Sequence, residues 1–406
     1  MASPRVSRRA LVQGAAISAG LVGLGAAGGV GTSTALARRD AQQGWGSDAT
    51  VPFYGPHQAG IVAVAPAFAR YLTFDLLPGT TAEGIRRMLR IITEDSAALA
   101  AGNSPLADSE PELAHIPANL TVTLGFGREL VVRAAGPGAV PSWLGPLPAF
   151  TVDRLEPRYT GGDLLVIVQS DDPLSVSHAA RVITRQTQSF VAPRWSLDGF
   201  RRSPGAAPSG TTMRNLFGQV DGTQGPHPGD EAFARSVFGE GVNTGNPAWL
   251  AGGTGFVLRR IAMDLDTWDE VDRHDRERAV GRRLDNGAPL TGEHEHDAAD
   301  FSARDNRGLP VIPDFAHMRR ARATSAQEVF ARRGYNYEVE QGVGDRPEAG
   351  LLFEAIGYDP SKQFVPTQRR LDQMDMMNLW ITPVGSAVYA IPPGCEPGGY
   401  IGQTLV

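Results

Sequence analysis

The sequence predicts an α+β fold built from two copies of one unit. Residues 164–185 and 351–370 share one order of features, namely an apolar strand, an Asp-Pro dipeptide and a helix. Such a repeat indicates an internal duplication, and two sheets with helices packed on their faces follow from it. Residues 203–210 are rich in Pro, Gly and Ser and form the predicted linker. We therefore expect an N-terminal domain over 51–205 and a C-terminal domain over 206–406.

In the first unit, short apolar or alternating segments are typical of strands. A helix is predicted over residues 81–99, because apolar residues recur there every three or four positions. A second helix is predicted around residues 176–185, after the Asp172-Pro173 start signal. The predicted strands of this unit are residues 60–64, 70–76, 120–126 and 164–168.

The second unit repeats this order. A strand over 255–264 leads into a helical stretch over 268–283, and a strand over 350–356 leads into a helix over 364–374. Residues 286–308 are polar, rich in Gly and Asp, and without apolar periodicity. They favour a solvated surface loop over a metal site, although the loop contains the run Glu-His-Glu-His-Asp at 293–297.

The N-terminus is typical of a targeting segment. Ser7-Arg8-Arg9 precedes a run of Ala, Gly, Leu and Val without charge until Arg38, which resembles a twin-arginine export signal. A small-x-small pattern at residues 35–37 predicts cleavage there. We expect a signal peptide over 1–37, a flexible leader over 38–50 and export to the extracellular or cell-envelope side. The run is too weakly apolar for a permanent membrane span.

Composition excludes several classes of function. The chain has 406 residues and a formal net charge of −6, without a basic block. This balance argues against nucleic acid as a partner. Cys395 is the single cysteine, so the chain has neither an internal disulfide nor a cysteine cluster for zinc or iron–sulfur binding.

Three motifs in order carry the functional prediction. Residues 218–222 read Gly-Gln-Val-Asp-Gly, and their glycines allow the backbone to hold Asp221 close against a flat or bulky group. Downstream lie Ala316-His317-Met318-Arg319 and then Arg332-Arg333-Gly334-Tyr335. This order resembles the dye-decolourising peroxidases, a family of haem enzymes. The resemblance covers nearly the whole chain after the signal peptide.

The resemblance implies a fold and an activity. The family has two ferredoxin-like domains, each an antiparallel sheet with packed helices, and the second holds most of the haem. A member is expected to bind haem b and to use hydrogen peroxide to oxidise small organic reductants, such as phenols and dyes, through an oxyferryl intermediate. A homo-oligomer is a family-level expectation.

The resemblance also assigns residues. His317 corresponds to the axial ligand of the haem iron, and an imidazole is a familiar ligand for it. Asp221 corresponds to the acid–base group on the open face, next to Gly222 against the cofactor, and predicts best activity on the acidic side of neutral. Arg332 corresponds to the arginine that assists O–O cleavage, with Arg333 as the competing assignment. Arg319 is predicted to pair with a haem propionate.

Some choices stay open in the sequence. An axial histidine usually donates its second N–H to a carboxylate or carbonyl, and Asp297, Asp300 and Glu328 are the candidate partners. Packing rather than electron transfer is the favoured interpretation of the aromatic residues Trp268, Tyr335, Tyr337, Trp380 and Tyr389. Two other functions compete with the peroxidase: a deferrochelatase-like protein that acquires iron from haem, and a haem carrier without catalysis.

Overall fold

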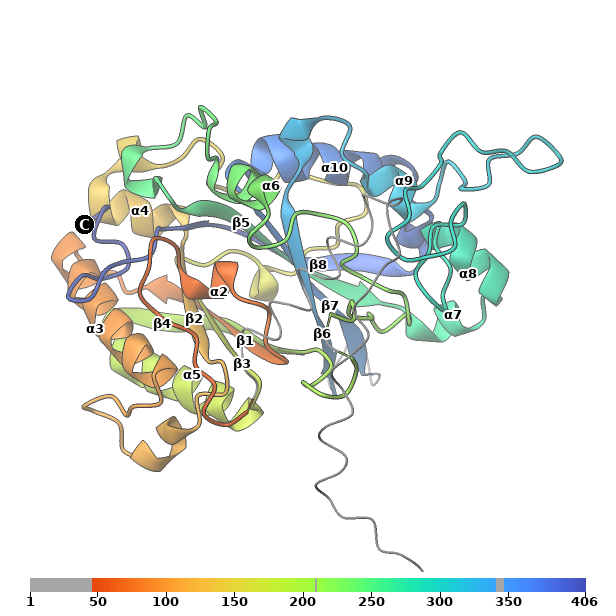
Figure 1. Ribbon diagram of the computed structural model, residues 1–406. Helices are drawn as coiled ribbons and strands as arrows, with labels where there is room; N and C mark the ends of the chain where they lie inside the picture. Colours follow the sequence, from red (N-terminus) through yellow and green to blue (C-terminus); the bar gives the residue numbers. More distant parts are fainter. Residues whose placement is uncertain (1–45, 209, 341–346) are drawn as a thin grey trace, which may run out of the picture.

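The computed structural model describes residues 46–208, 210–340 and 347–406 (Figure 1). The signal peptide predicted over 1–37 and most of the predicted leader lie outside the described residues. Within the part described, strands form two antiparallel sheets with helices packed against them, which confirms the α+β class (Figure 1).

The first sheet has the strand order β4-β1-β3-β2. Helix α3 (Ala82–Ala100) connects β1 to β2, and α5 (Pro173–Thr187) connects β3 to β4. A βαββαβ chain with this order is the ferredoxin-like arrangement that the resemblance implied. The strands are β1 (Phe68–Leu76), β2 (Thr121–Phe126), β3 (Leu164–Ser170) and β4 (Val191–Phe200).

The second sheet repeats the first. Its order is β6-β7-β5-β8, which is the same arrangement read from the opposite edge, and α10 (Pro360–Met374) stands where α5 stands in the first unit. The duplication predicted from residues 164–185 and 351–370 therefore corresponds to β3-α5 and β7-α10. The strands are β5 (Thr254–Met263), β6 (Ala331–Val339), β7 (Glu348–Gly357) and β8 (Ile381–Ile391).

The two sheets meet at both edges. Phe126 pairs with Ala390, and Phe200 pairs with Asn336, so the eight strands form a closed ring. These joints are short compared with the pairing inside each sheet, because each joint has a single residue pair. The ring places β6, β7 and the linker after β4 next to one another, and this is where the candidate site lies.

Capping residues explain the repeated Asp-Pro signal. Asp172 accepts a hydrogen bond from the Ser175 N–H at 2.7 Å, and Asp359 accepts one from the Ser361 N–H at 3.0 Å. Each is followed by proline at the first helical position, where the missing N–H costs nothing. The apolar face of α3 is buried against the first sheet, as its periodicity predicted.

Two predicted elements are wrong. Residues 60–64 do not form a strand, because the chain makes a short helix there, α2 (Ala59–Val62), whose carbonyl oxygens are bound by a distant arginine. The helical stretch predicted over 268–283 is divided into α7 (Leu265–Asp269) and α8 (Arg273–Val280), because Asp272 caps a new helix. Strands β4, β6 and β8 had no sequence prediction.

The β5–β6 connection is long and carries α7, α8 and α9 (His317–Ala321) to one side of the second sheet (Figure 1). It contains the segment 286–308, which has no helix or strand, as predicted for a loop. The remaining short helices are α4 (Arg128–Ala135), α6 (Glu231–Phe233), η1 (Pro111–His115), η2 (Pro137–Ala139), η3 (Pro157–Tyr159), η4 (Ala234–Phe238), η5 (Ala248–Leu250), η6 (Ala326–Glu328) and η7 (Met376–Leu379).

In the part of the chain that the structure describes, we find no helix with the length and apolar character needed to cross a membrane.

Candidate active site

Asp221 lies in a tight loop in the segment that follows β4. An isolated β-bridge joins Arg214 to Val220, and the Asp221 N–H donates to the Met213 carbonyl at 2.8 Å. Gly218 and Gly222 have φ angles of +78° and +116°, a backbone region that favours glycine. The two glycines are therefore required by the turn that presents the carboxylate.

The Asp221 carboxylate has two neighbours. The Nη1 atom of Arg332 lies 3.4 Å from Asp221 Oδ1, and the Asn215 side-chain amide donates to Asp221 Oδ2 at 3.2 Å. Asp221 and Arg332 keep 21% and 26% of their side chains accessible, so both still present polar atoms to a small ligand. The pair thus combines a proton acceptor with a fixed positive charge.

The structure separates the contacts of Arg332 and Arg333. The two arginines are consecutive on β6, so their side chains lie on opposite faces of the sheet. Arg333 donates to the carbonyl oxygens of Gly60, Ile61 and Ala63, which holds α2 in place. The guanidinium beside Asp221 belongs to Arg332.

His317 is the first residue of α9, and its ring is oriented by a buried carboxylate. The His317 Nδ1 lies 2.6 Å from Asp375 Oδ2, and only 1% of the Asp375 side chain is accessible. This contact leaves Nε2 as the ring atom available for a metal. A carboxylate that accepts from an imidazole fixes the tautomer of the ring and raises its basicity as a ligand.

The partner of His317 is Asp375 and not one of the three carboxylates considered from the sequence. Asp297 accepts instead from the backbone of Glu293 and His294, and Asp300 accepts from Ser302. Glu328 accepts from Thr324 and pairs with Arg370. Asp375 is 58 residues from His317 and follows α10, so no local sequence signal relates the two.

Electrostatics connect His317 to the Asp221–Arg332 pair. Burial of the imidazole opposes its protonation, but Asp375 outweighs this effect and raises the pKa of His317. The charges of Arg332 and Asp221 act on the same pKa in opposite directions. The three side chains therefore share one electrostatic environment.

A cavity of about 910 Å³ opens beside Asp221. It falls within the size range of small-molecule and cofactor sites. Polar groups on its wall come from Asp221 and Arg332, and apolar groups come from Leu351 and Phe353 of β7. Gly222 lines it as well, and the linker residues 203–208 border it in part. His317 does not line this cavity.

Haem carries two propionate carboxylates, so a site that fits it should offer cationic donors. Arg282 is such a donor. Arg282 is 6% exposed and donates through Nη1 to the carbonyl oxygens of Gly287 and Glu295. Its Nη2 is buried and has no hydrogen-bond partner among the residues that the structure describes. Burial, followed by the charge of Arg332, lowers the pKa of Arg282. Buried donors require partners, and an anionic group such as a propionate would satisfy this one. With the free Nε2 of His317, the residues present fit haem.

The predicted role of Arg319 stays a prediction. Its guanidinium donates to the carbonyl oxygens of Ile312 and Phe301, and Nη1 lies 3.6 Å from Asp314. These contacts hold the approach to α9. Of the aromatic residues interpreted as packing residues, Trp268 and the three tyrosines are buried, and Trp380 is partly buried.

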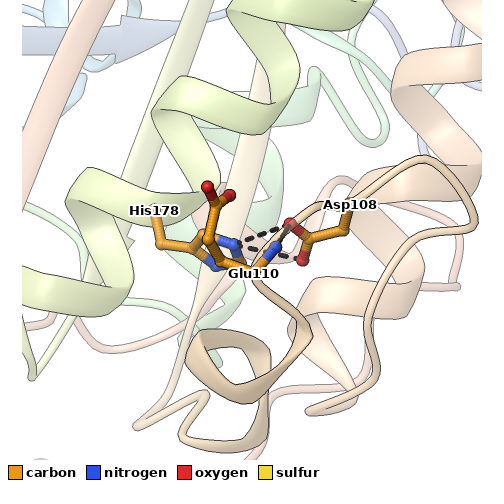
Figure 2. Close-up of side chains that lie close together, drawn as sticks. All are labelled: Asp108, Glu110 and His178. Atoms are coloured by element: carbon orange, nitrogen blue, oxygen red, sulfur yellow. Dashed lines mark hydrogen bonds and ion pairs between the residues drawn. The ribbon is translucent and has the colours of Figure 1, made fainter.

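A second group of titratable residues lies in the first unit, away from these side chains in sequence (Figure 2). Asp108, Glu110 and His178 offer donor atoms within 4.8 Å of one another. His178 Nε2 lies 3.1 Å from Asp108 Oδ2, and the Glu110 N–H donates to Asp108 Oδ1 at 3.0 Å. Asp108 is thus already satisfied, and the group fixes the loop after α3 to α5.

Comparison with known proteins matches both halves of the chain. Residues 58–201 match the family model for the N-terminal part of Dyp-type peroxidases, and residues 212–396 match the model for the C-terminal part. The dye-decolorizing peroxidase of Thermobifida fusca (strain YX) is 39% identical over 364 residues, which covers 86% of this chain and 83% of that protein.

Two further relatives extend the comparison. A protein of Shigella flexneri named deferrochelatase is 30% identical over 371 residues, covering 87% of each chain. The crystal structure of a DyP-type peroxidase from Cellulomonas bogoriensis superposes with a TM-score of 0.85 at 48% identity, covering 88% of this chain and 98% of that one.

Proposed function

This chain belongs to the Dyp-type peroxidase family and is a peroxidase, and from that premise we propose that it uses haem b and hydrogen peroxide to oxidise small organic reductants. Haem is a cofactor in this family, as in the haem complex of the Rhodococcus jostii RHA1 DypB N246H variant. Phenols and dyes are the proposed reductants, since the relative with 39% identity is named for dye decolorization.

His317 and Asp375 hold the cofactor in this proposal. The Nε2 atom of His317 would ligate the iron, while Asp375 would hold the proton on Nδ1 through the 2.6 Å contact. Arg282 offers its unpaired Nη2 to a propionate. When bound, haem supplies the iron redox chemistry that couples peroxide reduction to the oxidation of donors.

Asp221 and Arg332 act on the peroxide. Asp221 accepts a proton from one peroxide oxygen and returns it to the oxygen that departs as water. Arg332 stabilises the negative charge that develops on the departing oxygen. The observation that carries the proposal is the 3.4 Å Asp221–Arg332 pair on the wall of the cavity, in the same electrostatic environment as His317.

The test is an absorption spectrum of the haem-loaded protein before and after one equivalent of hydrogen peroxide. We expect the Soret band to lose intensity or to shift when peroxide is added, and to recover when a phenol is added. Asp221→Asn should keep the cofactor and slow the change by about 100-fold or more. A wild-type rate in Asp221→Asn would remove the proton-transfer role, and a haem spectrum inert to peroxide would favour the carrier function.

A deferrochelatase-like function is the second candidate, because a 30% identical relative of the same family carries that name. The two functions differ in their products. Release of metal-free porphyrin after incubation with haem and a reductant would favour this second function. Turnover of a phenol with an intact Soret band would favour the peroxidase.

We also propose that the protein is exported by the twin-arginine pathway. Arg8-Arg9 and the weakly apolar run that follows support this proposal. Replacing both arginines by lysine should retain the protein inside the cell. Mass spectrometry of the exported wild type should find a new N-terminus at Arg38, and an exported protein that keeps residues 1–37 would contradict the predicted cleavage.

A further inference from the structure

We propose that Glu295 is a positioning residue that clamps the loop carrying Asp221, an inference that rests on the proposed role of Asp221. Glu295 lies in the segment 286–308, which looked like a solvated loop in the sequence. Its carboxylate instead contacts the active-site loop directly.

One oxygen of Glu295 binds both arms of that loop. The Thr212 hydroxyl donates to Glu295 Oε1 at 2.6 Å, and the Thr223 hydroxyl donates to the same oxygen at 2.9 Å. Thr212 precedes the loop and Thr223 follows Gly222, so Asp221 lies between the two contacts. Hydrogen bonds to an ionised acceptor are stronger than neutral ones, and these two join the ends of the turn.

The clamp is itself held in place. The Glu295 carbonyl oxygen accepts from Arg282 Nη1 at 2.9 Å, and Arg282 is almost fully buried. On the preceding side, Asp297 accepts from the N–H groups of Glu293 and His294 at 2.8 and 2.9 Å and closes a turn. The backbone and the side chain of Glu295 are therefore both anchored. A residue that holds the Asp221 loop in place needs this anchoring.

The bonds inside the turn lie mostly before Asp221, where the Arg214–Val220 bridge and the Asn215 backbone close it. Outside the Glu295 contacts, Asp221 is held by its N–H bond to Met213, by the Asn215 amide and by the ion pair with Arg332. Gly218 and Gly222 give the turn little intrinsic stiffness. A small displacement of a catalytic group is enough to lower a rate by about 100-fold. The contacts of Glu295 thus oppose a displacement of the Asp221 carboxylate from Arg332.

The experiment compares Glu295→Ala with Glu295→Gln in the haem-loaded protein. The alanine variant should react with hydrogen peroxide about 10- to 100-fold more slowly. The glutamine variant keeps an acceptor oxygen for both hydroxyls and should stay within about threefold of wild type. Glu293→Ala, an exposed glutamate in the same loop, is the matched control and should react at the wild-type rate.

A second readout does not depend on catalysis. Amide hydrogen exchange over residues 213–222 should become at least about tenfold faster in Glu295→Ala, with or without haem, while exchange in β5 stays unchanged. If Glu295→Ala does not fold, Thr212→Val combined with Thr223→Val removes the same two hydrogen bonds. The corresponding serine replacements should restore the wild-type behaviour.

The outcomes separate this inference from the proposed function. In an Asp221→Asn background, Glu295→Ala should give no further loss of rate, because both changes act through one carboxylate. A slow Asp221→Asn with a wild-type rate and wild-type exchange in Glu295→Ala would overturn the clamp alone. A wild-type rate in Asp221→Asn would instead overturn the proton-transfer role, and the exchange experiment would then still decide whether Glu295 holds the loop.

Discussion

Arg332 and Arg333 are adjacent in sequence but serve different parts of the molecule. Arg332 is paired with Asp221 at the cavity, whereas Arg333 binds three carbonyl oxygens around α2 and faces Glu354 across the β6–β7 pair. Burial raises the pKa of Glu354, and the charge of Arg333 lowers it in part. Arg332 thus contacts a carboxylate at the cavity, whereas Arg333 holds α2 and lies beside a buried carboxyl.

This division predicts opposite effects of two alanine substitutions. Arg333→Ala should lower the free energy of unfolding by about 2–3 kcal/mol, because it removes charged hydrogen bonds from buried carbonyls. Arg332→Ala should change stability by less than about 1 kcal/mol and slow the reaction with peroxide by about 100-fold. Urea unfolding and stopped-flow absorbance measure the two effects, and equal losses of stability would contradict the division.

The Asp375 contact predicts a weaker haem site when its charge is removed. Asp375→Asn should reduce the affinity for haem by about 10- to 100-fold, because the second partner of an axial histidine sets its orientation and basicity. Titration of the haem-free protein with haem measures this affinity. Asp300→Asn, at a carboxylate that the sequence left open as partner, should bind haem like wild type.

At the scale of elements, signals that act over a few residues of the sequence were sufficient to predict the longer helices. Helices α3, α5 and α10 were predicted from apolar periodicity and from capping residues. Strand β4 was missed because a proline and exposed polar residues interrupt its apolar residues. Helix α2 was misassigned because Arg333, far along the chain, binds its carbonyl oxygens.

The duplicated caps give a prediction at this scale. Asp172→Ala and Asp359→Ala should each lower the free energy of unfolding by about 1 kcal/mol, because each removes a side-chain acceptor from a helix N-terminus. The two effects should add, since the helices belong to different sheets. Asparagine at either position should preserve most of the stability in a urea titration, and a full loss with asparagine would argue against capping.

For the whole molecule, stability should depend on pH through Asp95, a half-buried carboxyl on α3. Burial, followed by the charges of Glu94 and Asp108, raises its pKa from 3.8 to about 6. The folded protein therefore binds this proton more tightly than the unfolded chain does. This contribution to stability is complete below pH 3.8 and is lost as the pH rises through about 6.

Asp95→Asn should remove that dependence. We expect the variant to be more stable than wild type by about 1 kcal/mol well above pH 6, since solvent screens part of the effect. Below pH 3.8 the two proteins should have similar stability. Unfolding curves at several pH values measure the difference, and a constant difference at all pH values would exclude Asp95 as its source.

The sequence by itself determined the fold class, the duplication, and the motif order around Asp221, His317 and Arg332, because these depend on periodicity, caps and short motifs within single segments. The tertiary structure decided which groups meet: Asp375 on His317, Arg332 rather than Arg333 on Asp221, and Glu295 across the active-site loop. Such pairs join segments far apart in the chain. Closure of the two sheets brings these segments together, and no local pattern encodes it.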